Sequence, residues 1–554
     1  MTVIPRIPLE KSRSAEDIMS AILTNRGFIS EKEMDAFLHP PAPTLDYLVK
    51  NAGIPEKSLR KTAELLEDAI KRGKDILVFG DYDADGVTAT TVMWRTLASM
   101  AQGTDARVLP FIPDRVRHGY GLSAAAVQDI EDGTAWKDTV YPDFSPKLVI
   151  TVDNGIVANQ AVAMLKEKGV TVVITDHHLP DKKLPTADCV VHTTRTSGAG
   201  IAWIVAMYID KESAVAKSLI DIATIGIVAD MMPLTDVNRA IVTMGLRLLS
   251  RATHPGLKSL YDLSGMTGKE MTTYDVSFGI APRLNAAGRL ANPLDALRLL
   301  CTTSVESAEK LARIIEGHNK ERQALTDTAI EQALSGRFPH NIVVIDSPEY
   351  HEGVIGLVAG KIMEKVNKPA IVISIRGETA KGSARSLPGI DITKLLRQVP
   401  DIFTGLGGHA GAAGFSLLAR DIPELKHKLY ALADKIIDKK LLVKQVAADI
   451  EITPRQVTFS LAHMLHSLEP YGMGNPKPRF LLRDVRVLED RKVGKNGNHR
   501  KLVIENDGIT KDVIWFNGEA AHPLSLIKEL VGTVEVNVWR DRETVQLVAQ
   551  HVEI

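Results

Sequence analysis

Acidic and histidine side chains follow three short apolar segments of this chain. Residues 75–80, 148–152 and 170–175 are rich in Val, Ile and Leu, and each runs directly into a polar turn. The groups that follow are Asp81, Asp83 and Asp85; Asp153 and Asn154; and Asp176, His177 and His178. Carboxylates and imidazoles are the side chains that bind divalent cations and move protons. The chemistry they indicate is metal-dependent hydrolysis.

The apolar segments are predicted to be buried parallel strands. They are rich in β-branched residues and alternate with helical patterns such as 56–71 and 161–169, which is typical of βαβ units. Ligands of open parallel sheets bind beyond the carboxyl ends of the strands. Up to five aspartates and two histidines would therefore share one crevice, where like charges are costly without a cation. Asp230, at the end of another apolar run, is a further acid.

The donor types favour Mn²⁺ or Mg²⁺, with two ions expected. Oxygen ligands with one or two imidazoles suit these cations. The chain has only Cys189 and Cys301, far apart, which excludes a thiolate zinc site and a disulfide framework. A single Asp-Gly or Asp-Asn-Gly after a strand is more often a plain turn. Three acid-bearing strand ends together favour the metal site.

Composition describes an ordinary α/β enzyme of several domains. The 554 residues predict three to four domains, and 67 basic residues nearly balance 68 acidic ones. This balance excludes a globally basic nucleic-acid coat, so a polyanion partner would need a local basic patch. No run of 18 apolar residues and no apolar secretory segment appears, so we expect a cytoplasmic protein that does not contact membranes.

The pattern of elements predicts the order of the domains. A long helix with charged residues on most faces is expected at 303–336, between two α/β domains. Alternating segments near the C-terminus predict a small antiparallel β domain. The predicted boundaries are 1–50 for an N-terminal extension, 51–302 for the first α/β domain, 303–336 for the connecting helix, 337–440 for the second α/β domain and 441–554 for the β domain.

Residues 476–501 are the one strongly basic stretch, with nine basic and three acidic residues. Phe480, Trp515 and Phe516 lie nearby in sequence. A basic β domain with a few aromatic rings suits tracking of a single-strand backbone with limited stacking. The alternative is a solvated charged hairpin. The basic residues are Lys477, Arg479, Arg483, Arg486, Arg491, Lys492, Lys495, Arg500 and Lys501.

The glycine-rich segment 405–414 is a candidate phosphate cradle, because glycines let backbone N–H groups approach oxygens. Its alternative is a tight turn before a strand. Arg385 could contact phosphate bidentately, and its alternative is a surface arginine. Arg283 and Arg289, which flank Asn285, could equally be an ordinary surface pair.

Motifs in order along nearly the whole chain resemble the DHH phosphoesterase superfamily, and within it the RecJ single-strand DNA exonucleases. Small departures are Tyr350, Ala384, and Arg117 with His118, none of them a proposed ligand. The resemblance implies a parallel-sheet DHH domain, a connecting helix, an α/β DHHA1 domain and a C-terminal β-barrel OB-fold. The motifs are VFGDYDADG (78–86), IPDR and HGYGLS (112–123), VDNG (152–155), TDHH (175–178), VADMMPL (228–234), APRLNAAGRL (281–290), HEGVIG (351–356), GSARS (382–386), GGHAGAAG (407–414) and YGMGNPKPRF (471–480).

The resemblance also implies roles for individual residues. The implied metal ligands are Asp83, Asp85, Asp153, His177 and Asp230. Asp81 and Asp176 would support the ligands or act as secondary ligands. His178 would face the scissile phosphate, and whether it acts as an acid or as a ligand stays open. Asn285, Arg283 and Arg289 would lie beside the metal centre. The implied substrate contacts elsewhere are Ser383, Arg385, Gly407, Gly408 and His409 of the second domain, and we add Arg491, Lys492 and Lys495 of the third.

The activity so implied is 5′-to-3′ hydrolysis of single-stranded DNA by metal-activated water, in DNA repair and recombination. A monomer is expected, with single-stranded DNA, a single-strand DNA-binding protein and a helicase as partners. Two alternatives are a DHH phosphodiesterase of short oligonucleotides or cyclic dinucleotides, and a non-catalytic single-strand-binding scaffold. A small substrate would not need the basic β domain, and a scaffold would not need the complete set of acids and histidines.

Overall fold

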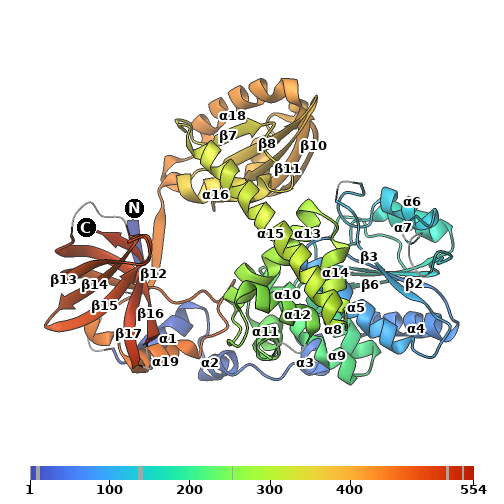
Figure 1. Cartoon of the computed structure of the whole chain (residues 1–554), viewed down its shortest axis with the longest axis horizontal. Coiled ribbons are helices and arrows are strands. Elements are labelled where there is room, and N and C mark those ends of the chain that lie inside the picture. The colour runs from blue at the N-terminus through green and yellow to red at the C-terminus, as the bar shows by residue number, and fades with distance from the viewer. Residues whose placement is uncertain are drawn as a thin grey trace. The chain divides into compact units, whose positions relative to one another are not determined.

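The computed structural model forms two compact units. Unit 1 comprises Met1–Ile22, Lys320–His463 and Pro478–Ile554, and unit 2 comprises Leu23–Asn319 and Met464–Lys477. Helix α15 (Val305–Leu334) runs from unit 2 into unit 1 (Figure 1). The structure describes residues 2–7, 13–115, 117–134, 136, 141–251, 254–518, 523–539 and 542–554.

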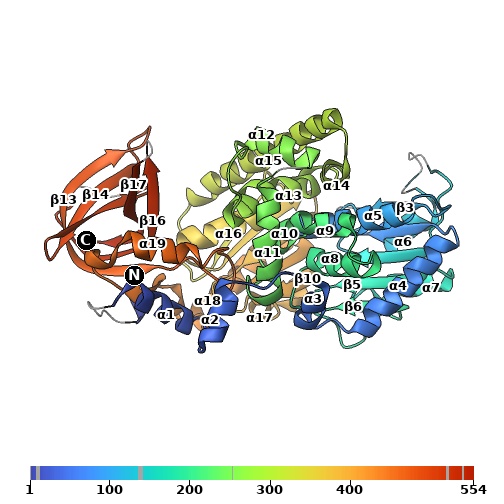
Figure 2. The same cartoon turned by 90° about the horizontal axis from the view of Figure 1, so that it is seen from below.

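Unit 2 is built on a five-stranded parallel sheet of order β3-β2-β4-β5-β6 (Figure 2). Central strands β2 and β4 are fully buried, as their continuous apolar sequences predict. Asn154 donates from Nδ2 to the carbonyls of Val152 and Phe79, at 2.9 and 3.4 Å, and so joins the ends of these two strands. The bounds are β2 (Ile76–Phe79), β3 (Val108–Phe111), β4 (Leu148–Val152), β5 (Thr171–Asp176) and β6 (Cys189–His192).

Helices cover both faces of this sheet. Ile76 and Val78 pack with α4, α5, α8 and α10 on one face, and Leu77 and Phe79 pack with α6 and α7 on the other. This alternation follows from the period of two along a strand. The helices of unit 2 are α2 (Glu31–Leu38), α3 (Leu45–Ala52), α4 (Glu56–Lys71), α5 (Ala84–Met100), α6 (Ala124–Glu131), α7 (Asn159–Glu167), α8 (Gly198–Ile209), α9 (Ala214–Ser218), α10 (Ile220–Ala229), α11 (Asp236–Leu249), α12 (Pro255–Ser264), the π-helix η1 (Asp275–Ile280), α13 (Ala281–Leu290) and α14 (Leu294–Cys301). Helix α1 (Ala15–Asn25) begins in unit 1 and ends in unit 2.

The first part of unit 1 is a mixed sheet of order β10-β11-β9-β8-β7. Only β7 and β8 pair in parallel, and the other neighbours are antiparallel. Helix α18 packs Leu425 and Leu429 into the apolar core of one face, and α16 packs Val358 and Ile362 into that of the other. The elements are β7 (Val343–Ser347), α16 (Ile355–Val366), β8 (Ala370–Arg376), β9 (Thr379–Arg385), α17 (Ile392–Leu396), η2 (Pro400–Ile402), β10 (Phe403–His409), β11 (Ala412–Leu418), η3 (Ala419–Asp421), α18 (Ile422–Ile436) and η4 (Lys439–Leu442).

The second part of unit 1 is a closed barrel of five strands in the order β13-β14-β15-β17-β16, which the pairing of β16 with β13 completes. Strand β12 extends this sheet beside β13, and β1 pairs in parallel with β12. Closure leaves no free strand edge in the barrel. The elements are β1 (Thr2–Ile7), β12 (Gln445–Glu451), η5 (Pro454–Gln456), α19 (Phe459–His466), β13 (Phe480–Val493), β14 (His499–Asn506), β15 (Ile509–Trp515), β16 (Leu526–Trp539) and β17 (Arg542–Glu553).

The predicted fold class is confirmed, but the contacts divide the chain differently from the predicted boundaries. Residues 464–477, expected inside the C-terminal β domain, belong to unit 2. The expected N-terminal extension is split as well, because β1 joins the sheet of the barrel and α2 and α3 belong to unit 2. Among the described residues, no helix is both long and apolar enough to cross a membrane.

Candidate metal centre

The turn after β2 holds Asp81, Asp83 and Asp85 at the start of α5. Asp83 caps this helix, because its Oδ1 accepts the Gly86 N–H at 3.0 Å. Asp85 is buried, and its two oxygens accept hydrogen bonds from the Ser197 hydroxyl (2.8 Å) and from the Gly198 and Ala199 N–H groups (2.7 and 3.0 Å). The N-terminus of α8 therefore fixes the Asp85 carboxylate and favours its negative charge.

The next two strand ends supply Asp153 and the Asp176-His177-His178 group. Asp153 follows β4 with φ of 63°, and its Oδ1 lies 3.1 Å from the His177 Nε2 without hydrogen-bond geometry. Two carboxylate oxygens of this acid cluster are buried without a hydrogen-bond partner, Oδ1 of Asp153 and Oδ2 of Asp81. A buried carboxylate oxygen needs a partner, and one without a hydrogen-bond donor is available to bind a cation.

His177 lies between several of these acids. Its Nε2 lies 3.8 Å from Asp85 Oδ2, and its Nδ1 lies 3.7 Å from Oδ2 of Asp230, at the C-terminus of α10. In three groups, one donor atom from each residue lies within 4.8 Å of the others: Asp81 with Asp83 and Asp153; Asp85 with His177 and Asp230; and Asp153 with His177 and His178. The structure thus brings all five predicted metal ligands together, and it places Asp81 and His178 among the possible donors as well.

The acids repel one another strongly. Burial and the charge of Asp83 raise the pKa of Asp81 to about 8. Burial and the charges of Asp85 and Asp83 raise the pKa of Asp230 to about 8, and burial with the charge of Asp85 holds the pKa of Asp153 well above its usual range. A divalent cation would remove this repulsion, so the donor set fits Mn²⁺ or Mg²⁺.

Asp176 is the exception among these acids. Its Oδ1 accepts hydrogen bonds from the His177 and His178 N–H groups (2.7 and 3.1 Å) and from His178 Nδ1 (2.8 Å), and its Oδ2 accepts from the Ile156 N–H (2.8 Å). Burial alone would raise its pKa, but the bonds to His178 and the backbone lower it. Asp176 therefore orients the two histidines.

Tyr120 is a site residue that the sequence did not single out. Its hydroxyl lies 2.7 Å from His178 Nε2, while Asp176 holds Nδ1 on the other side of the ring. With Nδ1–H donating to Asp176, the Tyr120 hydroxyl donates to Nε2 of the neutral ring. The motif HGYGLS contained this tyrosine, but the partner of its hydroxyl is 58 residues away.

Of the predicted residues of α13, Asn285 reaches the metal loop. Its Oδ1 accepts the Ala84 N–H at 2.9 Å, between Asp83 and Asp85. Burial raises the pKa of the Tyr82 phenol to about 12, and Arg289 lies near enough for its positive charge to oppose this rise. Arg283 is engaged elsewhere, because Nε donates to Glu316 Oε2 and Nη1 to the Gly279 carbonyl, both at 2.7 Å.

In unit 1, four residues of the second predicted set, Ser383, Arg385, Gly407 and His409, share one face of a sheet, whereas Gly408 pairs with Ala413 in the row between them. His409, Ala412 and Arg385 are register partners across β10, β11 and β9, and Gly407, Gly414 and Ser383 form the next such row. Paired residues point to the same face. Arg385 donates to the Ser383 hydroxyl at 3.1 Å, and burial lowers its pKa.

The expectation of a glycine loop at 405–414 is wrong. These residues form the β10–β11 hairpin, in which Gly407 pairs with Gly414 and Gly408 with Ala413. A side chain added at Gly407 or Gly414 would meet nothing within 4 Å. The glycines thus keep the face beside Ser383 and Arg385 flat and open, and their contact with phosphate stays a prediction.

More residues of the basic stretch 476–501 are paired with acids than the sequence predicts. Most of its arginines form ion pairs, and the pair of Arg500 with Asp490 is buried. Phe480 is fully buried in the barrel, so the expectation that it stacks on bases is wrong, whereas Phe516 is 55% exposed. The other ion pairs are Arg483 with Glu451 and Glu529, Arg486 with Glu505, Arg491 with Glu489, and Lys501 with Asp512.

Three predicted basic contacts remain at the surface. Arg491, Lys492 and Lys495 are exposed at the β13–β14 hairpin. Lys492 and Lys495 form no ion pair with any part of the chain that the structure describes. Arg491 lies 3.4 Å from Glu489, and both side chains are exposed, so this pair contributes little.

The fold and the site together define the class. A parallel sheet with aspartates and a histidine pair at its carboxyl edge, followed by a mixed α/β domain, makes the protein a DHH phosphoesterase. Family models agree: the DHH family N-terminal domain matches residues 75–227, the DHHA1 domain matches 340–435, and the RecJ OB domain matches 448–551.

Full-length relatives identify the family. The single-stranded-DNA-specific exonuclease RecJ of Bacillus subtilis is 35% identical over 561 residues, which cover 97% of this chain and 68% of the relative. Two crystal structures of Thermus thermophilus RecJ are similar over the whole chain and over 80% and 78% of their own chains. The Mn²⁺ complex has a TM-score of 0.82 at 31% identity, and the Mg²⁺ complex 0.76 at 30%. The chain belongs to the RecJ family.

The raised pKa values predict how stability depends on pH and metal. Without cations, the folded protein keeps protons on Asp81 and Asp230 up to about pH 8, whereas the unfolded chain loses them near pH 3.8. Their contribution to stability is full below about pH 3.8, declines as pH rises and is gone above about pH 8. In chelator, the Tm should therefore fall between about pH 5 and pH 8 and level off above, and Mn²⁺ should raise the Tm more at pH 8 than at pH 5.

The Asp81→Asn variant is the control for this experiment. It removes one of the titrating groups, so the fall of Tm with pH should be shallower than in the wild type. Equal pH profiles for the two proteins in chelator would contradict the assignment of the raised pKa to this site.

Proposed function

We propose that this chain is a divalent-metal-dependent exonuclease that degrades single-stranded DNA from the 5′ end. The observation that supports this most is the cluster of acids around His177, in which Asp81, Asp85 and Asp153 are buried and two carboxylate oxygens lack hydrogen-bond donors. The proposed substrate is inferred from the RecJ relatives, whose names state specificity for single-stranded DNA. The 5′-to-3′ direction rests on the motif resemblance alone.

The proposed ligands are Asp81, Asp83 and Asp153 for one ion and Asp85, His177 and Asp230 for the other. Such ions would supply a hydroxide from bound water at neutral pH and neutralise charge on the phosphate oxygens. The remaining residues orient groups: Asp176 and Tyr120 hold His178 from both sides, and Asn285 holds the loop of Asp83. In this arrangement His178 can move a proton only at Nε2, the nitrogen that faces Tyr120.

The small-substrate alternative has less support. The exposed cations of the barrel hairpin would have no role with a cyclic dinucleotide. Degradation of end-labelled single-stranded and duplex DNA, with and without chelator, tests the proposal directly. Release of 5′ label as mononucleotide before 3′ label supports the proposed direction, and the reverse order refutes it.

Removal of a metal ligand should separate chemistry from binding. For Asp83→Ala, Asp153→Ala and His177→Ala we expect at least about a hundredfold loss of turnover, because metal-held charge contributes several kcal/mol to the transition state. Affinity for a long single strand should persist, since it depends on surfaces elsewhere. Asp143→Ala removes an exposed carboxylate that pairs with Arg107, and serves as the control. Near-normal turnover in all three variants would show that the ligands are misassigned.

The β9–β11 face should act on the cleaved phosphate more than on overall affinity. We expect Arg385→Ala and His409→Ala to lower kcat/KM for cleavage more than they weaken binding of long strands, because two residues contribute little to a long polyanion interface. Arg397→Ala and His427→Ala alter exposed residues of the same unit and serve as controls. Equal losses of cleavage and binding, or no loss, would remove this face from the proposed site.

The barrel hairpin should set the salt dependence of strand binding. Each phosphate contact on a single strand releases about 0.7 counterion, so neutralising Arg491, Lys492 and Lys495 together should flatten the log–log slope by roughly two. Hydrolysis of very short oligonucleotides should change little. A triple alanine variant of Lys57, Lys61 and Lys168, exposed on unit 2, changes the net charge equally and should keep the wild-type slope. An unchanged slope in the hairpin variant would make these charges a solvated surface.

A further inference from the structure

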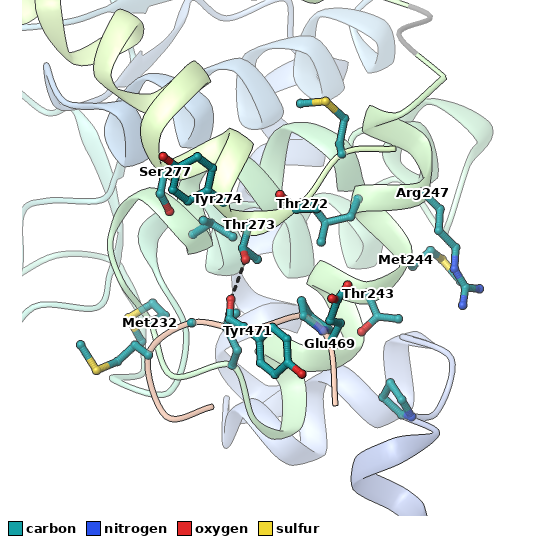
Figure 3. A pocket seen from close by; sticks show the side chains of 18 of the residues that line it. Met232, Thr243, Met244, Arg247, Thr272, Thr273, Tyr274, Ser277, Glu469 and Tyr471 are labelled. Carbon is teal, nitrogen blue, oxygen red and sulfur yellow. Dashed lines mark hydrogen bonds between the residues drawn. The ribbon is translucent and has the colours of Figure 1, made fainter. Parts of the chain in front are cut away.

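Residues Met464–Lys477, which we call the strap, leave unit 1 and return to it while packing entirely as part of unit 2. The strap, α11 and the segment before α13 line a pocket of about 1530 Å³. Figure 3 shows the strap as the pale orange ribbon, with the Thr273 hydroxyl donating to the Tyr471 carbonyl at 2.6 Å. Most of the motif YGMGNPKPRF therefore packs in unit 2, which holds the candidate metal centre.

Arg239 of α11 holds the strap by its backbone. It is 1% exposed, and its guanidinium donates to the carbonyls of Leu468 (3.1 Å), Glu469 (2.8 Å) and Pro470 (3.4 Å). Its Nε donates to the Phe37 carbonyl at 2.6 Å. It forms no ion pair within the described ranges, so carbonyl dipoles and the Phe37 ring, 3.9 Å away, must offset the cost of burying its charge.

The strap in turn holds the connector between α10 and α11, residues 230–235. The Leu234 N–H donates to the Met473 carbonyl at 2.7 Å. A Cβ added at Gly472 would lie 2.7 Å from Leu234, and one at Gly474 would lie 3.1 Å from Pro233, so both glycines permit this close approach. Asn475 braces the strap from within, because its Nδ2 donates to the Leu468 and Pro470 carbonyls at 2.7 and 2.8 Å.

The connector begins with Asp230, and its backbone includes unfavourable conformations. Met231 has φ of 56°, and Asp236, at the start of α11, has φ of 45°. Left-handed conformations of residues other than glycine are unfavourable and persist where the surroundings impose them. The Leu234 bond to the strap lies between these two residues and is one such constraint.

We propose that Arg239 is a positioning residue for the metal centre: by holding the strap, it fixes the connector that carries Asp230. This inference rests on the proposed role of Asp230 as a metal ligand. A guanidinium is required because it presents donors in several directions, whereas a lysine ammonium cannot span carbonyls on both the strap and the α2 end.

The test measures Mn²⁺ binding directly, by the EPR signal of free Mn²⁺ in titrations of the full chain without DNA. Loss of a residue that orients a metal ligand costs about 10- to 100-fold in affinity. We expect Arg239→Met to weaken binding of one ion about tenfold, with an intermediate effect for Arg239→Lys. The Mn²⁺ concentration for half-maximal hydrolysis should rise in parallel, while affinity for a long single strand in chelator stays unchanged. Arg376→Met, which removes an arginine bound to the Pro348 and Tyr350 carbonyls in unit 1, is the matched control.

A folded Arg239→Met protein with wild-type Mn²⁺ binding would overturn the inference. Should this variant fail to fold, Thr273→Val decides, because it removes one hydrogen bond to the strap without leaving a buried charge unpaired. We expect it to weaken binding of the same ion severalfold, and wild-type binding would overturn the inference. The two proposals fail separately: absence of DNA hydrolysis by the wild type refutes the proposed function, while the Mn²⁺ titrations still decide the role of Arg239.

Discussion

Repulsion among buried carboxylates is the constraint on which unit 2 is built. The sheet directs Asp81, Asp153 and Asp176 to one edge, and two helices add Asp85 and Asp230. Each acid that keeps its charge without a cation must find donors. Donors at the N-terminus of α8 pair the oxygens of Asp85, and N–H groups of its own turn and of Ile156 pair those of Asp176. Asp81 and Asp153 retain unpartnered oxygens. Among the acids at the strand ends, this division separates Asp176, which orients the histidines, from Asp81 and Asp153, which are proposed metal ligands. Asp85 is a proposed ligand as well, although donors of α8 already pair its oxygens.

Close packing around these acids leaves no room for side chains at certain positions. A Cβ at Gly198 would lie 2.3 Å from Asp153, and one at Gly226 would lie 2.4 Å from an oxygen of Asp85. Such distances are below van der Waals contact, so α8 and α10 can approach the carboxylates only with glycine there. The glycines of α8 and α10 therefore permit the close approach that also raises the pKa values of the acids.

The sequence was sufficient for features that depend on local order. Strand β4 spans the predicted residues 148–152, and the rule that ligands gather at carboxyl ends of parallel strands placed Asp83, Asp153 and His177 together. Features that depend on distant partners were out of reach. The contact of Tyr120 with His178, the burial of Arg500 against Asp490 and the return of the strap to unit 2 each join residues whose proximity only the folded chain creates. Similarly, glycines in 405–414 fit a loop and a hairpin equally well until their strand partners are known.

The nearly balanced total charge conceals a separation of charge that the chemistry requires. The metal-free acid cluster repels a phosphate backbone, so initial affinity must come from cations elsewhere, such as the exposed Lys492 and Lys495. Bound cations reverse the sign of the field at the cluster, so a phosphate is attracted there only after metal has bound. Affinity for DNA in chelator therefore reports the basic surfaces alone, and the additional affinity in metal reports the centre. Because the acids accept a phosphate only through the metal, an error in the position of Asp230 would weaken metal binding first and phosphate binding as its consequence.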